Sequence, residues 1–213
     1  KYIYVGDKKG AEAFIENGKT EIVDYTGKGL VMPGCGNGHA HYMLGYALKT
    51  IGTTIDLDEN PENFLTKTVP AAVKKARENG AKAVFGQGWS LNNFKSHIPT
   101  RQELDAICSD IPMYFLDDEC HKALTNTCML IKAGIMKEDG TAGKTELRGG
   151  KIEVDSNGIP TGFLSEQAQT YVRQFLDDIY TLEMSIANVA EIEHHMLSSG
   201  YTMYTEGWGN YFV

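Results

Sequence analysis

Residues 30–41 read LVMPGCGNGHAH, and this stretch predicts a strand that ends in a metal site. An apolar run, Leu30–Met32, meets a Pro-Gly breaker, and a glycine-rich segment then leads to His39 and His41. In an extended strand, residues i and i+2 point to the same face, so the two imidazoles would aim at one point. Neutral imidazole is the commonest protein ligand for zinc and similar divalent metals. The alternative is a coincidental pair on a solvated strand.

A helix is predicted directly after the two histidines. Residues 42–52 carry apolar side chains at helical spacing. The order strand, His-x-His, helix places polar groups at the carboxyl end of a strand. Barrel enzymes and open α/β sheets carry their active groups at that position.

Composition limits the classes of partner. The chain has 213 residues, 42% hydrophobic and 23% charged, with a formal net charge of -8. The acidic balance argues against nucleic acid and anionic membranes as partners. No apolar run is long enough to predict a transmembrane helix, and the first residues lack a signal-peptide core. Four widely spaced cysteines form no CxxC, so we expect reduced thiols and a cytoplasmic protein.

The remaining sequence predicts alternating strands and helices. Strands are expected at residues 1–5, 20–24, 81–85, 112–116, 151–154, 161–164 and 201–204. Helices are expected at 61–79, at 124–133 and at 167–199, and a further one begins at a capping box at Thr100. The helix at 61–79 either begins or is broken at Pro70, and the one at 167–199 is broken near 177–180. Residues 11–16 could form one helical turn, and 148–166 read as a hairpin.

Several other polar or aromatic residues follow predicted strands. His121 comes shortly after the strand at 112–116, and Glu166 stands just past the hairpin. Trp89 and Trp208 either line a pocket or pack in a core. The adjacent pair at 194–195 lies on a helix, where neighbours diverge by about 100°, so these two histidines are expected to be structural.

Six stretches, taken in chain order, resemble the amidohydrolase superfamily and most closely its amidohydrolase-3 branch, which includes N-substituted formamide deformylase-like proteins. They are GLVMPGCGNGHAHYMLG (29–45), GQGW (86–89), IPTRQELDAI (98–107), LDDECHKALTNTCML (116–130), GGKIEVDSNGIPTGFLSE (149–166) and LSSGYTMYTE (197–206). Each motif is weak alone except the first, whereas their common order is a strong signal.

The resemblance implies an α/β fold, a metal-dependent hydrolase TIM barrel that is only partly present here. Residues 1–32 would be N-terminal strands of a composite β-sandwich, and 33–54 the first barrel strand and helix. Residues 55–165 would be an inserted α/β lobe, and 166–213 would return to the incomplete barrel.

The resemblance also implies the site residues. His39 and His41 would be the first two metal ligands, and Glu166 a candidate third, as a carboxylate able to bridge two metals. His121 and Asn126 would line the site from the inserted lobe, and Trp89 would contact substrate. One or two divalent ions are expected, with zinc as the first choice.

Three places in the sequence depart from the family pattern. Asn37 replaces the usual aspartate two residues before His39, Glu119-Cys120 replaces Asp-Gly before His121, and residues 34–36 replace bulkier apolar residues. None of these removes an implied ligand, but each changes what surrounds the ligands.

A full barrel takes about 250 residues, and the family's middle-strand histidines and general-base aspartate find no counterpart in this chain. We therefore expect the N-terminal portion of a longer enzyme, inactive by itself. Its activity would be hydrolysis of a C–N bond in a small-molecule amide, formamide or cyclic amide. The alternatives are a non-catalytic ligand- or partner-binding fragment, and a small metalloprotein that completes its site by homo-oligomerisation.

Overall fold

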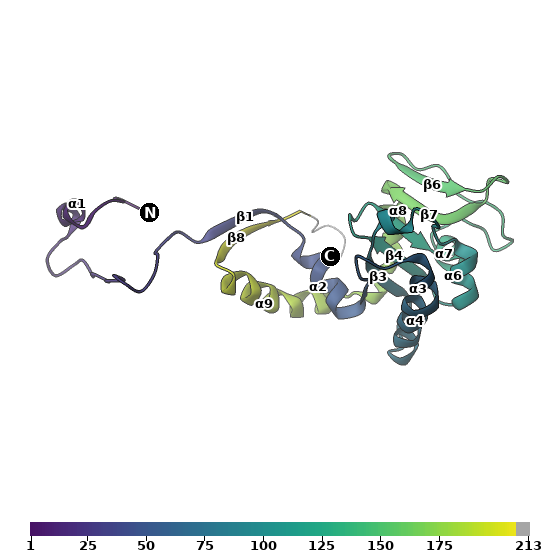
Figure 1. The fold of residues 1–213 in the computed structure, drawn as a ribbon, viewed down its shortest axis with the longest axis horizontal. Helices are drawn as coiled ribbons and strands as arrows, with labels where there is room; N and C mark the ends of the chain where they lie inside the picture. The colour runs from purple at the N-terminus through teal and green to yellow at the C-terminus, as the bar shows by residue number, and fades with distance from the viewer. Residues whose placement is uncertain (208–213) are drawn as a thin grey trace. The chain divides into compact units, whose positions relative to one another are not determined.

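The computed structural model describes residues 1–207, with residues 177 and 178 by their backbone alone, and Figure 1 shows its elements. The chain divides into two compact units, Lys1–Cys35 and Gly36–Val213. No helix in the described part of the chain is both long and apolar enough to cross a membrane.

The first unit contains one short helical segment and no strand among its residues 1–34. Helix α1 spans Lys8–Ala11 and continues into the 3₁₀ turn η1, Glu12–Phe14, as expected for residues 11–16. The strands expected at residues 1–5 and 20–24 are absent from the structure. An isolated β-prone segment leaves its backbone groups without partners, and no strand of this unit offers them.

The strand that leads to the two histidines begins later in the chain than the apolar run at residues 30–32 suggested. Strand β1 spans Cys35–Ala40, so it is the glycine-rich segment that forms the strand, whereas residues 30–34 are irregular. β1 pairs with β8, Tyr201–Glu206, in a two-stranded sheet (Figure 1). Gly36 lies against Met203, and the Ala40 carbonyl accepts a hydrogen bond from the Gly207 N–H. The two strands therefore run in the same direction.

The second unit also contains a six-stranded mixed sheet, in the order β2-β3-β4-β5-β7-β6. Its strands are β2 (Thr53–Thr54), β3 (Val84–Trp89), β4 (Met113–Asp117), β5 (Lys122–Thr125), β6 (Gly150–Val154) and β7 (Pro160–Glu166). Strands β2, β3 and β4 are parallel, and β5, β7 and β6 then alternate in direction. The carboxyl ends of β4 and β7 therefore meet at the same edge. The described strands close no barrel, whereas the mixed α/β class is confirmed.

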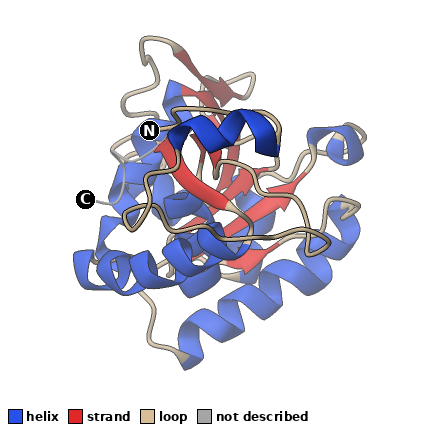
Figure 2. Cartoon of the chain, turned by 90° about the vertical axis from the view of Figure 1, so that its left-hand side faces the viewer, coloured by secondary structure: helices blue, strands red, loops and turns tan. Residues whose placement is uncertain are grey.

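The second unit also contains helices (Figure 2). They are α2 (Tyr42–Ile51), α3 (Pro61–Asn63), the π-turn η2 (Phe64–Thr68), α4 (Val69–Glu78), α5 (Leu91–Phe94), α6 (Arg101–Ile107), α7 (Thr127–Lys132), α8 (Gln167–Arg173), the 3₁₀ segment η3 (Gln174–Ile179) and α9 (Leu182–Ser198). The helix expected at 124–133 is wrong in its first residues, because these complete β5 by pairing with β4.

Pro70 lies at the beginning of α4, so one of the two outcomes expected for residues 61–79 is found. It is the second residue of α4, directly after η2, where the Val69 N–H bonds to the Phe64 carbonyl one residue further back than in an α-helix. A proline lacks the N–H that an α-helical turn needs and crowds the carbonyl four residues earlier. The wider π-turn accommodates both effects.

Alternating side chains of the sheet form a core on each of its faces. Met113 and Phe115 of β4 pack with α4 and α6, while Tyr114 and Leu116 pack with α7 and α8. This period-two alternation is what buries a strand on both faces. Leu44 joins the second of these cores, so α2 connects the two-stranded sheet to the lobe.

Candidate active site

The two histidines of the first motif converge at the end of β1. The His39 and His41 Nε2 atoms lie 3.0 Å apart, and their rings stand almost perpendicular. Two ligands at about 2.0 Å from a tetrahedral zinc ion lie roughly 3.3 Å apart, so the pair is close to a chelating geometry. Asn37 accepts the His39 backbone N–H at 3.1 Å through its side-chain oxygen. An aspartate at that position would accept the same bond, so the departure at Asn37 keeps this contact.

The end of β8 lies against the histidine pair. A Cβ on Gly207 would approach His41 Cε1 to 2.9 Å and His39 Nε2 to 3.0 Å, so only glycine fits there without moving the rings. Glu206 Oε1 lies 3.7 Å from His41 Nδ1. The sequence did not indicate either residue, although both come shortly after the strand expected at 201–204.

His121 and Glu166 meet at the carboxyl edge of the six-stranded sheet. His121 Nδ1 lies 2.9 Å from Glu166 Oε2, and the Glu166 N–H donates to the His121 carbonyl at 2.7 Å. Both side chains are more than half exposed. Glu166 has a φ of 55°, a conformation rare for a residue with a side chain. Strained backbone of this kind is common at functional sites, where the surrounding structure must maintain it.

Asp117 fixes the turn that carries His121. Its Oδ1 accepts the backbone N–H groups of His121 at 2.7 Å and Lys122 at 2.8 Å. Burial raises the pKa of this carboxyl. The two hydrogen bonds and the Lys122 ammonium act in the opposite direction, but burial is the larger effect. The same turn places Cys120 at a φ of 63°. Burial, followed by the charge of Asp117, raises the pKa of the Cys120 thiol to about 11.

One cavity brings the two groups together. It has a volume of about 270 Å³ and is lined by His41, Glu119, Cys120, His121, Glu166, Gln167, Gln169, Thr170 and Gly207. The carboxyl ends of β4 and β7 open onto it, as does the end of the β1–β8 pair. Ligands of α/β proteins bind at such edges. The cavity is therefore the candidate active site.

Two residues expected at the site lie in the core instead. Asn126 and Trp89 are completely buried. Trp89 Nε1 donates to the Phe115 carbonyl at 2.9 Å, and Asn126 holds four backbone groups and begins α7. Neither lines the cavity. Trp208 lies outside the described residues.

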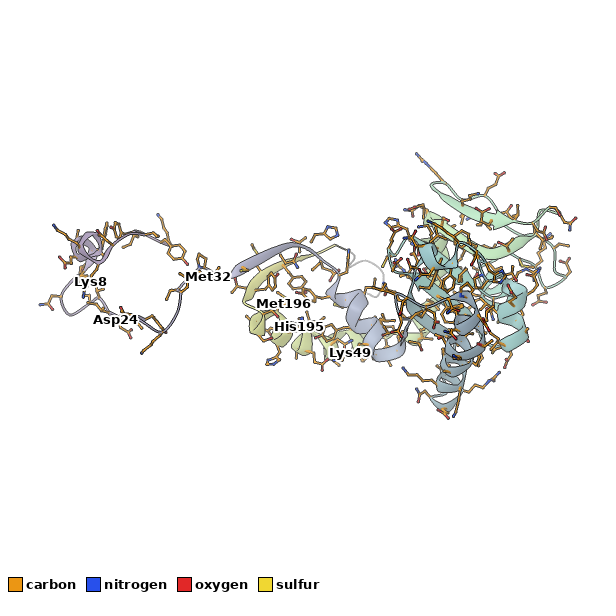
Figure 3. The ribbon with its side chains drawn as sticks, in the orientation of Figure 1. Lys8, Asp24, Met32, Lys49, His195 and Met196 are labelled. Carbon is orange, nitrogen blue, oxygen red and sulfur yellow. The ribbon has the colours of Figure 1, made fainter. Side chains whose placement is uncertain are left out.

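His195 lies on α9, with its ring 6.1 Å from that of Tyr42 (Figure 3). This aromatic contact links α9 to α2. It agrees with the structural role expected for the adjacent histidines on that helix.

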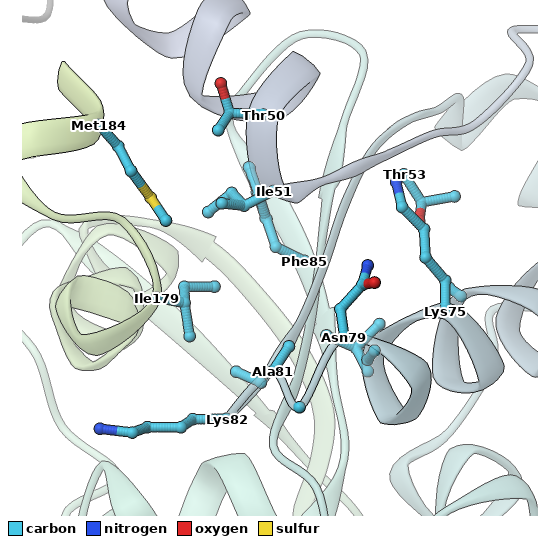
Figure 4. A pocket seen from close by; sticks show the side chains of 15 residues that line it. Thr50, Ile51, Thr53, Lys75, Asn79, Ala81, Lys82, Phe85, Ile179 and Met184 are labelled. Atoms are coloured by element: carbon cyan, nitrogen blue, oxygen red, sulfur yellow. The ribbon is translucent and has the colours of Figure 1, made fainter. Parts of the chain in front are cut away.

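A second cavity, of about 330 Å³, lies at the opposite, amino end of β3 (Figure 4). Its lining includes Ile51, Phe85, Ile179 and Met184, and its charged members are lysines. No histidine, cysteine or carboxylate lines it. Although it is larger, it lacks groups for metal binding or proton transfer, so we assign the site to the smaller cavity.

The donor atoms fit part of a metal centre. Two neutral imidazoles are suitable ligands for zinc and related ions. Within residues 1–207, no cluster of three or more His, Cys, Asp or Glu side chains is arranged to hold a metal ion. The structure thus supplies a convergent pair, with further carboxylate and imidazole groups on the same cavity.

The sequence is similar to those of several known proteins. The sequence is 31% identical over 153 residues to an N-substituted formamide deformylase of Arthrobacter pascens, covering 70% of this chain and 26% of that protein. It is 29% identical over 217 residues to the exoenzymes regulatory protein AepA of Pectobacterium carotovorum subsp. carotovorum, covering 97% of this chain and 43% of that protein. The chain thus spans less than half the length of these curated relatives.

A solved structure shares the fold. An uncharacterized metal-dependent hydrolase from Pyrococcus horikoshii superposes with a TM-score of 0.50 and 22% identity, covering 95% of this chain and 36% of that one. The sequence model of the amidohydrolase family called Amidohydro_3 matches residues 21–212. This match covers most of the chain and includes both histidine-bearing segments of the cavity. The chain therefore belongs to the amidohydrolase family.

Proposed function

We propose that this chain forms the amino-terminal part of a metal-dependent amidohydrolase that cleaves a C–N bond of a small amide, formamide or cyclic amide. The observation that carries the proposal is the convergence of His39 and His41 Nε2 at 3.0 Å beside a cavity that His121 and Glu166 also line. A paired imidazole site next to a carboxylate–imidazole pair suits hydrolysis better than passive binding.

His39 and His41 would hold the divalent ion, and Glu166 is the proposed carboxylate ligand because it lines the same cavity. A bound ion of this kind lowers the pKa of water and polarises a carbonyl group. Zinc is the first candidate because imidazole and carboxylate donors suit it. The proposal covers a site with one divalent ion and a site with two.

His121 is the proposed substrate-binding residue of the cavity. Its Nδ1 is engaged by Glu166, so the other ring nitrogen is the one available to a ligand. The backbone bond between the same two residues holds the ring near the cavity. His121 would therefore bind a polar group of the substrate, such as an amide oxygen or nitrogen.

The relative from Arthrobacter pascens is named for the deformylation of N-substituted formamides. That name supports the C–N bond class and makes such formamides the first substrates to test. Because this chain covers 26% of that protein, the activity is proposed for the whole enzyme. The isolated 213 residues are expected to be inactive.

The test is hydrolysis of a panel of N-substituted formamides, linear amides and cyclic amides by the full-length protein. Activity is expected on at least one class, lost after chelation and restored by added zinc, cobalt or manganese. The variant His121→Gln should raise KM more than it lowers kcat. Activity that is unaffected by complete removal of metal would overturn the proposal, as would inactivity on every C–N substrate.

A further inference from the structure

Glu206, the last residue of β8, connects three parts of the second unit. Its Oε2 accepts the backbone N–H of Met43 at 3.1 Å, and its Oε1 lies 3.7 Å from His41 Nδ1. Only 15% of its side chain is exposed, against 43% for His41. The carboxylate is thus mostly enclosed between the histidine and the start of α2.

The contact with Met43 holds this carboxylate in place. Met43 belongs to the first turn of α2, a helix of 10 residues, where backbone N–H groups have no partner inside the helix. The N-cap residue, His41, makes no side-chain cap. Glu206 supplies the missing acceptor, and its negative charge suits the amino end of a helix. One oxygen is therefore fixed by the backbone while the other faces the imidazole.

The two nitrogens of His41 face different groups. Nδ1 faces Glu206, and Nε2 faces His39 Nε2. The 3.7 Å separation is longer than a hydrogen bond, so the present contact is electrostatic. A carboxylate on this side still favours the tautomer with its proton on Nδ1, which leaves the Nε2 lone pair available to a ligand.

We propose that Glu206 is a positioning residue for His41: it selects the tautomer and orientation in which Nε2 binds a divalent ion. The inference rests on the proposed function in one respect, namely that His41 is a metal ligand. Its structural basis is the pair of contacts that Glu206 makes with Met43 and His41, and these do not depend on the proposed function. The competing role is a helix cap alone.

The variant Glu206→Gln separates these two roles. Its amide oxygen can still accept the Met43 N–H, so α2 keeps its cap and the unfolding midpoint of the metal-free protein should stay near wild type. Its amide nitrogen then faces His41 Nδ1 and donates, which favours the tautomer with the proton on Nε2. Zinc affinity should fall by about 10- to 100-fold.

A matched control is Glu191→Gln. Glu191 lies on α9, and its carboxylate pairs with Lys49 of α2 at 2.8 Å, exposed and away from the cavity lining. The variant Glu191→Gln removes one negative charge, as Glu206→Gln does, and the charge it removes also contacts α2, through Lys49. Zinc affinity should remain within about two-fold of wild type, since an exposed pair of this kind contributes little.

Two measurements on the full-length protein decide the matter. Calorimetric zinc titration gives the affinity, and nitrogen-15 NMR of the neutral imidazoles gives the His41 tautomer without metal. A reduced affinity together with a shifted tautomer in Glu206→Gln supports the inference. Wild-type affinity in that variant overturns it. If wild type binds no zinc while the tautomer still shifts, the metal function fails but the orientation of His41 by Glu206 stands.

Discussion

Asn126 is the residue at which the resemblance and the structure differ most. Its Oδ1 accepts the backbone N–H groups of Met113 and Met129 at 3.0 and 3.1 Å. Its Nδ2 donates to the carbonyls of Cys108 and Ile111 at 3.1 and 2.9 Å. Each polar atom of the side chain is therefore engaged with the backbone, and the residue joins β4, α7 and the end of α6.

Replacement of Asn126 by aspartate should destabilise the protein. The carboxylate keeps the two accepted bonds but leaves two buried carbonyls without donors, so the free energy of unfolding should fall by about 3 kcal/mol or more. Urea unfolding measures this loss.

The exposed Asn93, whose Nδ2 donates to the Leu57 carbonyl at 2.7 Å, gives a matched control. Asn93→Asp should cost about 1 kcal/mol or less. Unchanged stability of Asn126→Asp together with a raised KM would instead favour the substrate-binding role that the resemblance implied.

Cys120 should be an unreactive thiol despite its place on the cavity wall. With its pKa raised from 9.0 to about 11, roughly one molecule in a thousand carries the thiolate at pH 8. Alkylation by iodoacetamide, followed by mass spectrometry, should be about 100-fold slower than for a thiol of ordinary pKa.

The rate at Cys120 should rise about tenfold per pH unit between pH 8 and 10, because the thiolate fraction rises in proportion. Cys35 is exposed and provides the internal reference. Equal rates for the two cysteines at pH 8 would show that Asp117 and burial do not protect Cys120.

At the scale of elements, the GQGW stretch belongs to strand β3, which extends beyond the strand expected at residues 81–85. Gly88 lies in β3 with a φ of 126°, and a Cβ there would overlap the Ile55 carbonyl oxygen. The Ile55 N–H bonds to the Gln87 carbonyl at 2.8 Å, so the two chain segments are tied at this point. Glycine is required both for the backbone angle and for the close approach.

Gly88→Ala should therefore lower the free energy of unfolding by about 2–3 kcal/mol, from strain and overlap together. Gly158→Ala is the control, because its φ is 76° but no atom lies within 4 Å of a Cβ there. That variant should lose only about 1 kcal/mol. Thermal unfolding of both variants tests the difference, and equal losses would mean that the contact with Ile55 carries no energy.

Local patterns predicted those elements whose signals lie within a few residues. The capping box at Thr100 starts α6 as expected, and the hairpin at 148–166 gives β6 and β7. The strand β1 was misplaced because its glycines have little β-propensity alone. Pairing with β8, more than 150 residues away, is what makes it a strand. Pairing of this range cannot be found from local spacing.

At the scale of the whole molecule, the candidate site combines segments that the sequence predicted with others that it did not. His39, His41, His121 and Glu166 were all expected from the motifs, and the structure brings His41, His121 and Glu166 onto one cavity. Glu206 was missed because its bond to Met43 joins residues 163 positions apart. Asn126 and Trp89 were expected at the site because a motif does not report burial.

Metal binding by the full-length protein tests the account most directly. Metal-free protein should be titrated with zinc by calorimetry, comparing wild type with His39→Ala, His41→Ala and, as a control on exposed α9, His194→Ala. We predict binding by wild type and by His194→Ala, and a loss of at least about tenfold in affinity in each of the other two variants, because each removes one of two convergent imidazoles. Zinc affinity that is unchanged in both His39→Ala and His41→Ala would contradict the account.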